Sequence, residues 1–103
     1  MKQTREFASL MVGFVWYLDD AVDLARFKTE EPLFWEYAEH ALEALNHAWE
    51  ERWREAVSAL DQSIRTLEAA SVKYQHSWLV EHLNDCLGQL KATKFDVEKL
   101  EGQ

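Results

Sequence analysis

The chain has 103 residues, 48% of them hydrophobic and 13% aromatic, which suits one domain with its own core and excludes a disordered chain. A net charge of −8 argues against direct nucleic-acid binding and against docking on anionic membranes. With only three glycines and one proline, the composition excludes turn-rich β architectures. It predicts an all-α fold, a small antiparallel bundle or helical-hairpin array of about four helices, in a single domain over residues 1–103.

The first predicted helix runs from about Thr4, a candidate N-cap, to Phe27. Its apolar residues recur at three- and four-residue spacing, and Val12, Val15 and Trp16 extend the apolar surface almost all round its middle. A helix that is apolar on every side is buried on every side. In so short a chain, this pattern predicts a second subunit and therefore a homodimer.

The same segment has some features of a secretory signal peptide. Lys2 and Arg5 precede an apolar run over 7–18, but Asp19 follows the run directly and no cleavage site separates them. The run is also too short to span a bilayer. Cys86 is the only cysteine, which fits a reducing compartment. We therefore predict a cytoplasmic protein that does not associate with membranes.

Pro32 predicts the start of a second helix that folds back on the first, because proline fits the first helical turn. The helical pattern then continues to Ala70. A single helix of that length would exceed about 50 Å, so we predict a break at 50–54, where charged residues cluster. The seam predicted to face the core contains Trp35, Ala38, Leu42, Leu45, Trp49, Trp53, Ala56, Leu60, Ile64 and Leu67.

The last long helix, with Ser71 or Ser77 as its cap, is predicted to carry one apolar face made of Val72, Leu79, Leu83, Cys86, Leu87 and Leu90. The sequence Thr93-Lys94-Phe95-Asp96 has the form of a capping box with aspartate in place of glutamate. It predicts a separate short helix over 94–101.

Residues 51–64 resemble the turn and second helix of a tetratricopeptide repeat. The matching residues are Trp53 at the aromatic position, Ala56 and Ser63 at the small positions, and Leu60 and Ile64 at the large apolar positions. The resemblance covers one repeat over about 40–68, with His40 in place of an aromatic residue and Glu68 in place of the closing proline. It implies a helical hairpin that binds peptides or proteins.

Acidic residues around the first predicted turn form a candidate metal site. The candidate ligands are Asp20, Asp23, Glu36, Glu39 and His40. The pattern is similar to the all-α nucleotide pyrophosphohydrolases, which hold magnesium with acidic residues on adjacent helices. That resemblance implies a magnesium-dependent hydrolase, although the second half of the family pattern is reduced to Glu81-x-x-x-Asp85. The alternative is a solvated acidic face, because these residues lie opposite the predicted apolar seams.

Three other patterns resemble catalytic or metal-binding motifs but do not support such a site. Asp19-Asp20-Ala21-Val22-Asp23 has the DDxxD form of isoprenoid synthases, but those enzymes need a longer chain and a second motif. His40 and His47 are seven residues apart, which is not the i,i+4 spacing that binds zinc. His82 precedes Cys86 by one turn, but the apolar stripe around Cys86 predicts a buried, inert thiol.

The five tryptophans are the strongest departure from an ordinary composition. The candidate partner-binding residues are Trp16, Trp35, Trp49, Trp53 and Trp78. Tryptophan is enriched at the centres of interfaces, and core packing is the alternative. The sequence therefore predicts a helical interaction module that binds itself or another protein, without a cofactor and with no catalytic residue assigned. The alternatives are a magnesium-dependent hydrolase and an acidic inhibitor of a basic partner.

Overall fold

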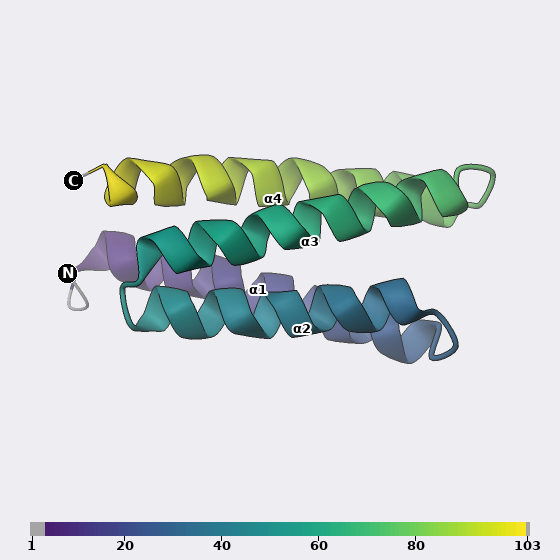
Figure 1. The fold of residues 1–103 in the computed structure, drawn as a ribbon, viewed down its shortest axis with the longest axis horizontal. Coiled ribbons are helices and arrows are strands. Elements are labelled where there is room, and N and C mark those ends of the chain that lie inside the picture. Colours follow the sequence, from purple (N-terminus) through teal and green to yellow (C-terminus); the bar gives the residue numbers. More distant parts are fainter. Residues whose placement is uncertain (1–3, 103) are drawn as a thin grey trace.

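The structure is a computed structural model that describes residues 4–102 as four helices joined by short turns. The helices are α1 (Arg5–Phe27), α2 (Pro32–Trp49), α3 (Trp53–Lys73) and α4 (Leu79–Glu101). Successive helices run in opposite directions, so the α1–α2 and α3–α4 turns lie at one end of the molecule and the α2–α3 turn lies at the other (Figure 1). The predicted all-α fold is confirmed. Within residues 4–102, no helix combines the length and apolar character needed to cross a bilayer.

Three of the predicted helix boundaries are confirmed. The Thr4 hydroxyl accepts a hydrogen bond from the Phe7 N–H at 3.1 Å and so caps α1. At the start of α2, Pro32 occupies the first turn. The predicted break at 50–54 falls between the end of α2 and the start of α3, where Glu51 has a φ of 57°. This left-handed conformation turns the chain sharply enough for α3 to return along α2.

The buried face of α2 differs from the predicted seam. Its buried residues are Phe34, Tyr37, Ala41, Ala44 and Ala48. By contrast, Trp35, Leu42 and Trp49 are exposed. The two stripes are neighbours on the helix, and both follow helical spacing. Because α2 packs between α1 and α3, its alanines occupy the close contacts, where tryptophan would hold the helices apart.

The α3 half of the predicted seam is correct. Its members Ala56, Leu60, Ile64 and Leu67 are buried, and Trp53, the first residue of α3, is partly buried. A polar contact joins this core to α1, because the Tyr17 hydroxyl and the Ser63 hydroxyl share a buried hydrogen bond. Burial raises the pKa of Tyr17, so the phenol stays neutral. The contact satisfies two hydroxyls that would otherwise be buried without partners.

The separate helix predicted over 94–101 is wrong, because α4 continues without interruption to Glu101. Its last turns are held against α3 by Val97, which is fully buried, and by the Lys94 ammonium, which lies 2.6 Å from an Asp61 carboxylate oxygen. At the other end of α4, the Ser77 hydroxyl accepts a hydrogen bond from the Leu79 N–H at 3.1 Å. Tertiary contacts therefore override the local capping signal.

A buried carboxylate ties the α1–α2 turn to the end of α3. Glu31 is 2% exposed, and its Oε1 lies 2.6 Å from the Lys73 ammonium. The Tyr74 hydroxyl donates to the same oxygen, and the Leu33 N–H donates to Oε2 at 3.2 Å. Burial by itself would raise the pKa of Glu31, but these donors together lower it below its usual value. Glu31 is thus ionised in the folded protein at neutral pH.

We expect Gly88→Ala to raise the free energy of unfolding by about 0.5–1 kcal/mol. Gly88 lies inside α4, is exposed, and has no atom within 4 Å of the position that a Cβ would take. Alanine therefore gains helix propensity without a clash. Urea denaturation followed by circular dichroism measures the change, and an unchanged or lower stability would contradict this reading of the site.

Candidate functional site

The seam between α1 and α4 is open. α1 packs on α2, α2 on α3 and α3 on α4, whereas α1 barely contacts α4. Three pockets of about 600, 460 and 320 Å³ follow one another along this seam. We call them together the α1/α4 groove. Its lining includes Gly13, Tyr17 and Leu24 of α1 and Leu79, Leu90 and Leu100 of α4.

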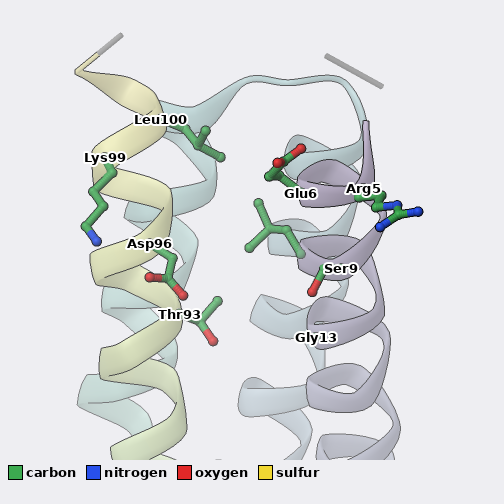
Figure 2. Close-up of a pocket in the computed structure, with 9 residues that line it drawn as sticks. Arg5, Glu6, Ser9, Gly13, Thr93, Asp96, Lys99 and Leu100 are labelled. Carbon is green, nitrogen blue, oxygen red and sulfur yellow. The ribbon is translucent and has the colours of Figure 1, made fainter. Parts of the chain in front are cut away.

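Small residues line both walls of the groove at its largest pocket. Figure 2 shows Ser9 of α1 and Thr93 of α4 pointing into the gap at its largest pocket, with Gly13 beside them. A Cβ added to Gly13 would meet no atom within 4 Å. The space above Gly13 is therefore open, and because Gly13 lines both the largest and the middle pocket, we call this space the Gly13 hole.

Exposed aromatic side chains stand along the groove. Trp16 is 74% exposed and lines the middle pocket. Phe27 and Trp78 pack edge-on, with ring centroids 5.6 Å apart, and line the pocket at the far end. Trp78 is 72% exposed in spite of this contact. The groove therefore has an apolar floor and aromatic edges.

The other candidate tryptophans lie away from the groove. Trp35 is exposed and donates to the Thr29 carbonyl at 2.9 Å. Trp49 is exposed beside Phe7, with ring centroids 5.8 Å apart. Trp53 is partly buried and meets the same Phe7 ring edge-on at 6.4 Å. Of the predicted partner-binding residues, only Trp16 and Trp78 line the groove pockets.

A cluster of three polar side chains lies where the middle and far pockets meet. An Asp20 carboxylate oxygen is 3.1 Å from His82 Nε2, and the Cys86 thiol donates to the second Asp20 oxygen at 2.8 Å. Cys86 Sγ is also 3.7 Å from His82 Nε2. One potential ligand atom from each side chain lies within 4.8 Å of the others. We call this group the Asp–His–Cys cluster.

The prediction of a buried thiol is correct, since Cys86 is 6% exposed. Burial and the hydrogen bond to Asp20 raise the pKa of Cys86 well above its ordinary value, so the thiol is protonated and a poor nucleophile. The imidazole also does not bridge the other two groups as in a catalytic triad, where the two ring nitrogens contact different partners. Here the single atom Nε2 faces both Asp20 and Cys86.

The proposed magnesium ligands are spread over the molecule. Asp20 joins His82 and Cys86, and Asp23 lines the far pocket next to them. Glu36 and Glu39 are exposed, and His40 Nδ1 lies 3.8 Å from a Glu43 carboxylate oxygen. Among the described residues, Asp20 with His82 and Cys86 is the group whose ligand atoms converge. The magnesium-dependent hydrolase therefore stays a prediction from the sequence.

Sequence reasoning named all three residues, Asp20 as a candidate metal ligand and His82 with Cys86 as a pair, but did not predict that they lie together. His82 and Cys86 are four residues apart, and this spacing places them on one side of a helix. Asp20 is distant in the sequence and reaches them only because α1 lies across the groove from α4.

No match is found among protein-family models, curated proteins or solved structures.

Proposed function

We propose that this chain is a self-associating interaction module, in which two copies pack through the α1/α4 groove about a two-fold axis. The observation that carries the proposal is the open hole over Gly13, next to the exposed ring of Trp16 on the same groove face. A cavity beside a large apolar side chain is self-complementary in a two-fold contact. Each Trp16 then enters the hole over the partner's Gly13.

The area that such a dimer must bury is a small part of the surface of the chain. A standard interface buries about 800 Å² per partner, which is about one-eighth of the 6379 Å² exposed by this chain. The groove also matches the length of a helix, because α1 alone spans about 35 Å at 1.5 Å per residue. The hydrophobic gain comes from residues that a single chain leaves in water: Val12, Trp16, Phe27 and Trp78.

The charges at the ends of the groove favour an antiparallel arrangement. Arg5 and Lys99 belong to the pocket at the α1 start, where two acidic residues balance them. Asp20 and Asp23 belong to the opposite end. A two-fold axis through the middle of the groove places this balanced end against the acidic end of the partner, and so avoids bringing two acidic ends together. The net charge of −8 on each copy opposes association, and salt weakens that repulsion.

The test is the solution mass of the full chain by light scattering, with Gly13→Leu as the disrupting variant. Leucine fills the hole, and we expect the dimer Kd to rise at least about tenfold, which corresponds to 1.4 kcal/mol. Leucine is also the better helix former, so unfolding does not explain a loss of association. Gly88→Leu makes the same change on α4 outside the pocket linings and should leave the mass unchanged.

The dimer should persist or tighten as salt is raised, because its contact is largely apolar. A monomer of the parent chain in both low and high salt would overturn the proposal. So would a Gly13→Leu variant that associates as well as the parent. An acidic inhibitor, the alternative reading, would instead capture a basic partner and release it in high salt.

Two other expectations belong to this proposal. The resemblance of 40–68 to a tetratricopeptide hairpin implies protein binding by α2 and α3 as well. A reducing compartment such as the cytoplasm suits a chain whose one cysteine is a free thiol.

A further inference from the structure

The Asp–His–Cys cluster lies in the lining of the groove, where α1 and α4 face each other. Asp20 comes from α1, whereas His82 and Cys86 lie one turn apart on α4. Carboxylate, imidazole and thiol are three of the side-chain groups that bind transition metals. Self-association through the groove needs none of these groups to meet. We propose that Asp20, His82 and Cys86 form a binding site for one Zn²⁺-class ion.

The distances within the cluster fit a tetrahedral zinc ion. With metal–ligand bonds near 2.0–2.3 Å, tetrahedral ligand atoms lie about 3.3–3.6 Å apart. The Asp20 oxygen lies 3.1 Å from His82 Nε2, and Cys86 Sγ lies 3.7 Å from the same nitrogen. Cys86 Sγ lies 2.8 Å from the other Asp20 oxygen, so the sulfur and the carboxylate move apart by about 0.5–0.8 Å when both bind the ion. The polypeptide therefore holds the ligands nearly in place without the ion.

The ligand types select the class of metal. A thiol and an imidazole are softer ligands than the oxygens that Mg²⁺ and Ca²⁺ require, and those cations also need six or more oxygen ligands. Only Asp20 supplies oxygen to this cluster. The site therefore favours zinc over the magnesium ion that the acidic residues suggest from the sequence.

The chemistry of binding involves one proton. In the metal-free protein the Cys86 thiol donates to an Asp20 oxygen, and that hydrogen bond must break. The thiol proton leaves to solvent, and the thiolate sulfur, an Asp20 oxygen and His82 Nε2 each give an electron pair to the ion. The Tyr37 hydroxyl, which lies within hydrogen-bonding reach of Cys86, donates to the thiolate and supports it.

Three protein ligands leave one tetrahedral position free. Asp20 and Cys86 both line the middle pocket, and Asp20 and His82 both line the far one, so the free position faces the groove. Water or a small ligand occupies it in a single chain. A site with three protein ligands and one exchangeable position is the pattern of zinc sites that bind or activate small molecules, rather than that of closed structural sites.

The experiment titrates the reduced, chelator-treated full chain with Co²⁺, which reports a bonded thiolate through a sulfur-to-metal charge-transfer absorption. Zn²⁺ then displaces the cobalt, and a competing chelator gives the zinc Kd. We expect one ion per chain, a thermal midpoint raised by zinc, and no displacement by Mg²⁺. Cys86→Ser and His82→Gln should each weaken zinc binding by about 100-fold or more.

Matched variants separate ligands from neighbours. Asp23→Asn alters the carboxylate next to Asp20, and His76→Gln alters an exposed histidine near the start of α4, so both should keep the parent affinity. His82 is exposed, so its substitution tests the site without disturbing the core. The proposal is wrong if cobalt gives no thiolate absorption, or if His82→Gln binds zinc as well as the parent chain. It is also wrong if the control variants lose as much affinity as the ligand variants.

Discussion

Phe34→Ala is expected to lower the free energy of unfolding by about 3–5 kcal/mol. Phe34 is fully buried in α2, and its ring stacks on Tyr74 with centroids 5.8 Å apart and an interplanar angle of 20°. The substitution deletes the buried ring and its packing contacts. It leaves a cavity between α2 and α3 that the helices fill only in part. Small domains have a total stability of about 5–15 kcal/mol, so this loss is a large fraction of it.

Urea denaturation at fixed protein concentration measures this loss, since association would otherwise alter the apparent stability. Leu42→Ala is the matched control, because Leu42 lies on the same helix with an exposed side chain. It should cost less than about 1 kcal/mol. Equal losses in the two variants would contradict the assignment of Phe34 to the buried face of α2 and of Leu42 to its exposed face.

Glu31→Ala is expected to lower the free energy of unfolding by about 2–4 kcal/mol. The substitution removes hydrogen bonds to charged or polar donors, each worth about 1.5–3 kcal/mol, and the side-chain cap of α2, worth about 1 kcal/mol. The loss is smaller than this sum because Lys73 is half-exposed and regains water when its partner is removed. Glu30→Ala is the control, since the Glu30 carboxylate is exposed beside Lys28.

The same carboxylate predicts how stability depends on pH. The folded pKa of Glu31 lies below the ordinary value of 4.5. A group with a depressed folded pKa contributes stability above its unfolded pKa and loses that contribution as the pH falls through the folded pKa. Stability should therefore decline below about pH 4.5, and Glu31→Gln should decline less steeply than the parent chain. If the stability of the parent chain and of Glu31→Gln fell with the same slope as the pH was lowered, the ion pair would have no role in this dependence.

The helices and their ends could be read from local chemistry. Thr4, Pro32 and the charged break before Trp53 act within a turn of their own position, so the sequence alone locates them. The heptad spacing of α2 failed to identify its buried face, because two adjacent stripes satisfy the same period. Packing density decided between them by placing Ala41 and Ala44 where the helices meet most closely.

The candidate sites depend on tertiary structure even more. The sequence by itself determined an all-α protein with surplus aromatic surface, because helix propensity and apolar periodicity are local properties. Only the tertiary structure decided that α1 and α4 stand apart, which exposes Trp16 beside Gly13. It also decided that Asp20 meets His82 and Cys86. Residues distant in the chain meet only when the whole core has set the spacing of its helices, and no local pattern encodes that distance.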